Sequence, residues 1–168
     1  NAQEVFSKIL IDNSLQKLTA EDKVMLSIFF SVQLTRTRHY IDEWARLPII
    51  LKEELERRFP CESLPVNMQE YFSLRDENEL KRETALNITK APDTYAIHFL
   101  SKHWVLLETT FSVPFIIGDN PLTMCNSTSS GLFGGSGLAT PGTEIYFPIS
   151  ATKALGMLCT TITEEINK

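Results

Sequence analysis

Residues 103–117 read HWVLLETTFSVPFII, and this stretch decides the fold class. It contains two runs rich in β-branched and aromatic residues, 103–110 and 113–117, separated by Phe111 and Ser112. Two such runs with a short break predict adjacent antiparallel strands. Residues 144–149 and 154–162 have the same character. We therefore expect residues 103–168 to form a small, mainly antiparallel sheet.

The chain before this stretch is predicted to be mostly helical. Residues 1–90 hold 13 Lys/Arg and 15 Asp/Glu, against 3 and 6 in residues 91–168, as expected for helices with a solvated face. We expect about five helices in residues 1–100: 3–12, 20–44, 49–58, from Ser73 or Asp76 to 88, and 92–100. The expected fold is α+β, with these helices packed on the sheet in a single domain, 1–168. Because the chain starts at Asn1 inside an expected helix, we interpret it as a fragment of a larger domain.

Two local signals fix the expected helix boundaries. Thr19 and Asp22 have the spacing of a capping box, which starts the helix 20–44. No Gly or Pro interrupts that helix before Trp44, and Pro48 suits the first turn of the next one.

One charged residue is out of place on the long helix. At 100° per residue, Arg36 falls in the middle of an apolar stripe formed by Met25, Ile28, Phe29 and Val32. The same projection places Gln33, His39 and Tyr40 beside Arg36. It places Arg38 on a polar outer face with Ser27, Ser31 and Asp42, and it gives a second apolar patch of Phe30, Leu34 and Ile41. Arg36 is therefore predicted to face the core and Arg38 to face solvent.

A buried guanidinium cannot lose its proton, so it needs a carboxylate, carbonyls or an anionic ligand. Asp119, at an expected strand end, is the first candidate partner, and Glu108 is the second. Three interpretations stay open: a structural clamp between Arg36 and Asp119, a ligand-binding site, or an incorrect helical phase.

Composition narrows the classes of partner. The net charge of −5 does not favour nucleic acid or an anionic membrane, and no apolar run reaches membrane-spanning length. Three widely spaced cysteines, Cys61, Cys125 and Cys159, fit a reducing compartment, and we expect a cytoplasmic protein. The three histidines lack metal-ligand spacing, so no metal site is predicted. The Gly-rich segment 126–143 is interpreted as a flexible loop, because it lacks the Lys-Ser/Thr of a phosphate loop. No cofactor can be named.

Four segments in order resemble a known family. They are 29–37 (FFSVQLTRT), 104–107 (WVLL), 115–122 (FIIGDNPL) and 147–150 (FPIS). Together they resemble the mainly bacterial domain-of-unknown-function family 4238 (DUF4238). Gly118 stands where that family has a small hydroxyl residue, and the family's N-terminal histidine-bearing motif is not found in this chain. The resemblance implies that Gln33, Arg36 and the turn Asp119-Asn120-Pro121 belong together, but it implies no activity.

Two functions are compatible with these residues. The first is an interaction or regulatory module, in which Arg36 and Asp119 form a structural clamp. The alternative is an enzyme, a hydrolase or metal-dependent nuclease, that binds a small molecule or an anion. In that case Gln33, Arg36, Tyr40 and Asn120 would bind the ligand, and Asp119 with Arg36 would be the catalytic candidates.

Overall fold

The computed structural model describes residues 1–58, 77–126 and 137–159. The chain forms two compact units, Asn1–Leu34 with Ala91–Lys168, and Thr35–Lys90. We call them unit 1 and unit 2 and describe each by itself. The boundary expected between residues 100 and 103 separates helices from strands along the chain. The two units are instead defined by tertiary contacts, so their boundaries differ from it. The single domain stays a prediction.

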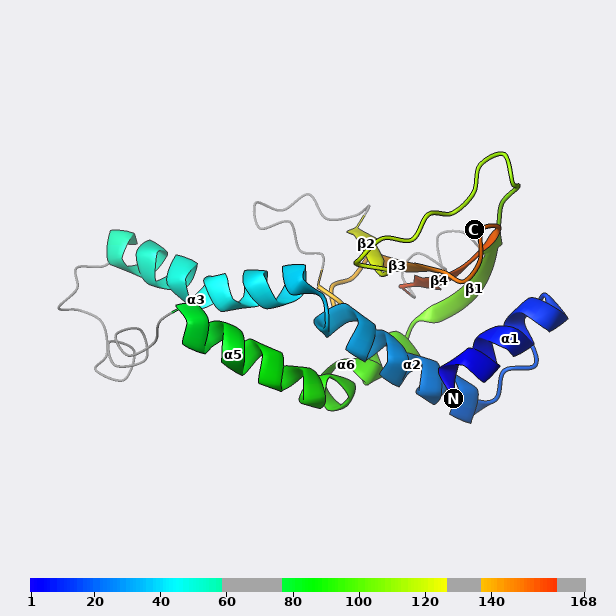
Figure 1. The fold of residues 1–168 in the computed structure, drawn as a ribbon, viewed down its shortest axis with the longest axis horizontal. Coiled ribbons are helices and arrows are strands. Elements are labelled where there is room, and N and C mark those ends of the chain that lie inside the picture. Colours follow the sequence, from blue (N-terminus) through cyan, green and yellow to red (C-terminus); the bar gives the residue numbers. More distant parts are fainter. Residues whose placement is uncertain (59–76, 127–136, 160–168) are drawn as a thin grey trace. The chain divides into compact units, whose positions relative to one another are not determined.

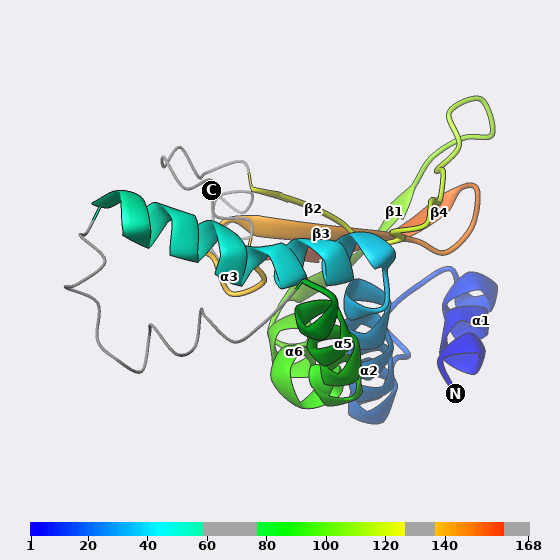
Figure 2. The same cartoon turned by 60° about the vertical axis from the view of Figure 1, so that its left-hand side comes forward.

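Unit 1 combines helices with an antiparallel sheet, so the predicted α+β class is confirmed. Its helices are α1 (Ala2–Asp12), α2 (Ala20–Thr35) and α6 (Ala91–Leu100). Its strands are β1 (His103–Glu108), β2 (Thr123–Asn126), β3 (Thr143–Pro148) and β4 (Lys153–Leu158). The strand order is β1-β4-β3-β2, and every neighbouring pair is antiparallel. The three helices lie on one side of the sheet (Figures 1 and 2).

The predicted capping box at the start of α2 is confirmed. Asp22 N–H donates to Thr19 Oγ1 at 3.1 Å, and Thr19 N–H donates to an Asp22 carboxylate oxygen at 3.1 Å. Asp22 also accepts from Lys8 Nζ of α1 at 3.0 Å. These bonds satisfy free N–H groups of the first turn and connect it to the preceding helix.

Aromatic rings form the centre of unit 1. Phe30 of α2 is fully buried, and its ring lies 5.1 Å from that of Phe147 on β3, 5.8 Å from Phe99 on α6 and 5.9 Å from Trp104 on β1. The ring of Phe6 on α1 stacks on Phe147 at 5.6 Å. Trp104 Nε1–H donates to the Phe99 carbonyl at 2.9 Å, which satisfies its polar group inside the core. Elements far apart in the sequence are therefore joined through one cluster.

The expected pairing of residues 103–110 with 113–117 is wrong. β1 pairs with β4, and residues 113–117 are not a strand. Val113 N–H donates to the Thr110 carbonyl at 3.0 Å, and Thr109 Oγ1 donates to the Val113 carbonyl at 2.8 Å. These local bonds form a turn in place of a ladder, and Pro114 removes one N–H that a ladder would need. The strand β2 was not predicted, since its four residues are too short to show a pattern.

Unit 2 contains α3 (Arg38–Arg58), α5 (Glu77–Asn87) and a short 3₁₀ helix, η2 (Ile88–Lys90). Pro48 lies inside α3 and does not begin a helix, contrary to expectation. Lys81 of α5 forms an ion pair with Asp42 of α3 at 3.4 Å. The candidate caps Ser73 and Asp76 lie outside the described residues. The expected set of about five helices is thus only approximately right, because the breaks fall elsewhere.

The predicted continuous helix 20–44 is interrupted at Arg36 and Thr37. The Thr37 hydroxyl accepts from Tyr40 N–H at 3.2 Å, and the Thr37 carbonyl accepts from Ile41 N–H at 3.1 Å. These are the bonds of an N-cap residue, so Thr37 starts α3 two residues after α2 ends. A Thr can start a helix without any Gly or Pro beside it, and the sequence pattern therefore did not reveal the break.

Candidate functional site

Arg36 does not face a core in the structure. Its side chain is exposed, and the residue lies in the bend between α2 and α3. Met25 and Ile28, of the apolar stripe that defined the predicted phase, are 41% and 37% exposed. The buried face of α2 consists of Leu26, Ser27, Phe30, Ser31, Leu34 and Thr35. The prediction of an inward-facing Arg36 is therefore wrong.

The physical reason is that α2 carries two apolar faces. Phe30 lies at the centre of the aromatic cluster, and the small side chains Ser27 and Ser31 are buried with it. Phe29 of the predicted stripe is half-buried beside Phe6 and Phe147, whereas Met25 and Ile28 stay exposed. Ser31 Oγ donates to the Ser27 carbonyl at 2.7 Å, which satisfies its hydroxyl inside the core. Serines can therefore occupy a buried face that the helical projection assigned to solvent.

The outward position predicted for Arg38 is confirmed. Its side chain is 94% exposed and forms an ion pair with Asp42, one turn later, at 3.5 Å. Such exposed pairs contribute little to stability.

The other predicted site residues differ in environment. Gln33 and Tyr40 are half-buried, and the Tyr40 ring packs against Trp44 at 5.6 Å. Asp119 and Asn120 are exposed where the backbone bends, whereas Pro121 is buried. Gln33 and Asp119 belong to unit 1, and Arg36 and Tyr40 belong to unit 2. The clamp and the ligand-binding site both combine residues of the two units, so both stay predictions.

The second candidate partner, Glu108, has a different contact within unit 1. Its carboxylate accepts from Lys153 Nζ on the neighbouring strand β4, and this lysine also donates to the Asn13 side chain. The Lys153 ammonium holds the pKa of the Glu108 carboxyl below its ordinary value. Glu108 therefore has a structural role, connecting the end of α1 to β1 and β4.

Polar groups that the sequence reasoning missed lie on β2 and β3. Tyr146 Oη donates to the Glu144 carboxylate, and Cys125 is the cross-strand neighbour of Glu144. Burial raises the pKa of the Tyr146 phenol, and the Glu144 carboxylate raises it further. Desolvation and Glu144 likewise raise the pKa of the Cys125 thiol. Both groups therefore stay protonated at neutral pH, which disfavours Cys125 as a nucleophile. In the sequence, only the two-residue spacing of Glu144 and Tyr146 could have indicated this cluster.

The histidines form no metal site in the part of the chain that the structure describes. No group of three or more His, Cys, Asp or Glu side chains that could hold an ion occurs there. His103 is exposed and His98 is half-buried, and the His39 side chain lies outside the described part. Most of the Gly-rich segment, residues 127–136, is also outside it.

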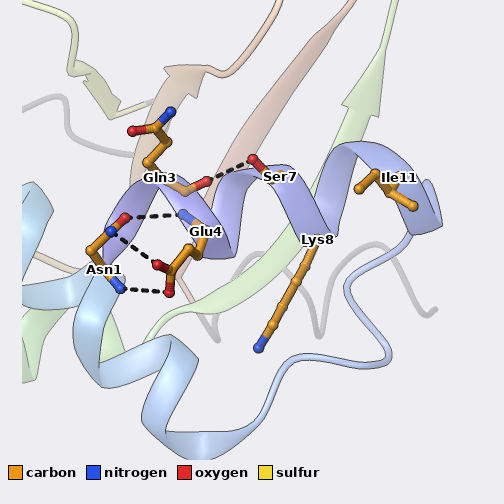
Figure 3. Close-up of a pocket in the computed structure, with 6 residues that line it drawn as sticks. All are labelled: Asn1, Gln3, Glu4, Ser7, Lys8 and Ile11. Atoms are coloured by element: carbon orange, nitrogen blue, oxygen red, sulfur yellow. Dashed lines mark hydrogen bonds and ion pairs between the residues drawn. The ribbon is translucent and has the colours of Figure 1, made fainter.

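A shallow hollow of about 530 Å³ runs along α1 (Figure 3). Its lining residues are Asn1, Gln3, Glu4, Ser7, Lys8 and Ile11. Their polar groups are largely taken by the helix itself: Glu4 N–H donates to the Asn1 side chain at 3.2 Å, and Ser7 Oγ donates to the Gln3 carbonyl at 2.9 Å. Lys8 pairs with Asp22. The hollow is shallow and open, unlike a ligand pocket, which encloses most of its ligand.

The loop between β1 and β2 carries four exposed apolar side chains within seven residues, including the two most exposed ones described in unit 1, Ile116 and Phe111. Phe111, Val113, Ile116 and Ile117 are 83%, 69%, 87% and 58% exposed. Hydrogen bonds hold the loop both internally and to the β3–β4 connection. The Thr110 and Ser112 hydroxyls are 2.6 Å apart, and Phe115 N–H donates to the Ala151 carbonyl at 2.8 Å. Figure 1 shows it extending beyond the strands. Because residues 113–117 were predicted as a strand, their exposure was missed.

Comparison with known proteins identifies the family. The model of the family described as "Protein of unknown function (DUF4238)" matches residues 1–168. The chain belongs to this family. No curated protein and no solved structure matches this DUF4238 chain. Among its described residues, no helix is both long and apolar enough to span a membrane. Neither the family description nor the described geometry supports the alternative of an enzyme around Gln33, Arg36 and Asp119.

Proposed function

We propose that this DUF4238 chain is a protein-interaction module and that the loop 109–117 is its contact surface. The observation that carries the proposal is the exposure of Phe111, Val113, Ile116 and Ile117 on one short segment. Contiguous exposed apolar groups are typical of interaction sites, because burying each side chain contributes roughly 1.5–3 kcal/mol. We call these four side chains the apolar loop patch.

The hydrogen bonds of the loop support the same proposal. Thr109, Thr110 and Ser112 bond within the loop, and Phe115 bonds to the β3–β4 connection at Ala151. A segment that is already ordered loses less conformational entropy when a partner binds it. The patch is therefore presented on a preorganised support.

The test uses photo-crosslinking in cells of the source organism. A photoreactive amino acid replaces Ile116 in the full-length protein, and a matched variant carries it at Ile97, which is 59% exposed on α6. We expect a covalent adduct from position 116 and none from position 97. The adduct partner is then identified, purified and titrated against the wild-type protein.

The titration distinguishes specific binding through the loop from non-specific hydrophobic binding. The double variant Phe111→Ser, Ile116→Ser should weaken binding at least about tenfold, since two anchors of roughly 1.5 kcal/mol or more are lost. Ile97→Ser should bind like the wild type. Equal binding by the double variant would show that the loop is not the contact surface.

A further inference from the structure

The strand β1 lies at one edge of the four-stranded sheet, with β4 on one side. Thr109 N–H donates to the Thr152 carbonyl at 2.9 Å, just past the end of the β1–β4 ladder. In an antiparallel pair, residues point their N–H and C=O alternately toward the partner strand and away from it. His103, Val105 and Leu107 therefore bond to β4, and Trp104, Leu106 and Glu108 direct their backbone groups outward. Within the described residues these outward groups have no partner strand.

Among the described residues, this edge lacks most of the features that prevent strand addition. Protected edge strands are short, carry charged side chains or proline, contain a bulge, or are covered by another element. The one acid of β1, Glu108, lies at the end of the strand and is paired with Lys153. β1 is six residues long, reads HWVLLE, and pairs with β4 without a bulge. The opposite edge strand, β2, has only four residues and directly follows the Pro121-Leu122 pair. The two edges of the sheet thus differ, and β1 is the one open to another strand.

We propose that two copies of this chain pair antiparallel along β1, with Leu106 of one copy opposite Leu106 of the other. This inference goes beyond the proposed function, because the β1 edge is a second contact surface, distinct from the loop 109–117. The alternation of the outward groups permits this register: Trp104 then lies opposite Glu108, and about six backbone hydrogen bonds form between the chains.

The side chains of β1 also complement themselves in this register. Val105 of each copy lies opposite Leu107 of the other, in the pairs whose side chains approach most closely. Val105, Leu106 and Leu107 are all half-buried, so each retains apolar surface for a second copy to cover. Glu108 meets Trp104 and not a second acid, so no like charges oppose each other across the pair. A second copy therefore satisfies both the backbone groups and the apolar side chains of this edge.

The register gives a direct test by cysteine crosslinking of the full chain. Leu106→Cys is introduced with Cys61, Cys125 and Cys159 replaced by serine. In a hydrogen-bonded antiparallel pair the two Cα atoms at this position are about 5.5 Å apart, within the range of a disulfide. The matched control is Met124→Cys in the same background. Ile149 N–H donates to the Lys153 carbonyl, so Tyr146 and Glu144 direct their backbone groups toward β2. Their partners Thr123 and Cys125 therefore bond to β3, and the backbone N–H and C=O of Met124 face outward at the other edge.

Light scattering after size exclusion supplies the second measurement, from about 1 to 200 μM protein. We expect twice the mass of one chain at high concentration, and rapid disulfide formation by L106C at least tenfold above M124C. Leu106→Pro removes an outward N–H and should give a folded monomer by circular dichroism, whereas Met124→Pro should still dimerise.

Two outcomes would overturn the pairing. One is a wild-type chain that stays monomeric at about 200 μM, with L106C crosslinking no faster than M124C. The other is a dimer that persists in L106P and is lost in the Phe111→Ser, Ile116→Ser variant, which places the dimer contact on the loop. In both cases a different protein that binds the apolar loop patch would leave the proposed function intact. That function fails separately if the double serine variant binds every partner like the wild type.

Discussion

Val105 of β1 fills the space beside Gly156 of β4: a Cβ built on Gly156 would lie 2.8 Å from Val105 Cγ2 and 3.4 Å from Leu107 Cδ1. The two residues are cross-strand partners, and Gly156 is also the partner of Tyr146 on β3. The φ angle of Gly156 is not positive, so its backbone conformation does not require a glycine. The close approach of the Val105 and Leu107 side chains does. The absence of a side chain at Gly156 lets Val105 and Leu107 pack closely at the centre of the sheet.

Gly156→Ala should therefore lower the free energy of unfolding by about 1–3 kcal/mol, the usual effect of adding a methyl group to a filled space. Chemical denaturation of the two proteins measures the difference. Gly118→Ala is the control, because nothing lies within 4 Å of its added Cβ. An unchanged stability of Gly156→Ala would mean that Val105 moves aside freely.

Ser27→Ala should stabilise the protein. Ser27 Oγ is buried and has no hydrogen-bond partner among the described residues. An unsatisfied buried hydroxyl costs about 1–3 kcal/mol, and alanine also favours the helix. We expect a gain of about 1 kcal/mol in thermal or urea unfolding. Ser31→Ala, which removes a hydroxyl bonded to the Ser27 carbonyl, should give no such gain.

Asp22 should make stability depend on acid pH. The Thr19 backbone N–H and the Lys8 ammonium hold the pKa of its carboxyl below the ordinary value of 3.8. A lowered pKa in the folded state stabilises the protein above pH 3.8, and this contribution is lost as the pH falls through the folded-state pKa. Asp22→Asn should thus be less stable than the wild type at pH 7, and the difference should shrink as the pH falls below 3.8. The control, Glu21→Gln, changes an exposed neighbour. An unchanged difference across this range would contradict the assignment.

Arg36→Met should have a small effect on folding. Because the side chain is exposed, its loss should change the free energy of unfolding by no more than about 1 kcal/mol. Arg38→Met, at a 94% exposed side chain, should behave alike in the same urea titration. A loss of about 3 kcal/mol or more for Arg36 alone would indicate a desolvated charge pair, and would favour the clamp.

Local signals in the sequence predicted local structure well. The Thr19 and Asp22 capping box depends on residues three apart, and the structure contains it. The runs 144–149 and 154–162 overlap β3 and β4 within the described residues, since alternating apolar residues reflect the sheet directly. The order of helices followed by strands was therefore predictable from the charge distribution and the β-rich runs.

The candidate site could not be predicted, because it depended on which side of α2 is buried. Phe29 and Phe30 both pack against Phe147, but only Phe30 is fully buried, because its ring also meets Phe99 and Trp104. Likewise, β1 pairs with β4, whereas residues 113–117 were the predicted partner because strands close in sequence often pair. Non-local packing decided both features.

The aromatic cluster also sets the order in which the chain can mature during synthesis. Phe6 and Phe30 are synthesised before unit 2, whereas their partners Phe99, Trp104 and Phe147 follow only after all of unit 2. Until β3 is complete, the first two helices have no sheet to cover their rings, and exposed apolar surface of this kind attracts chaperones and aggregates. The aromatic side chains of α1 and α2 can therefore be buried only after β3 has been synthesised.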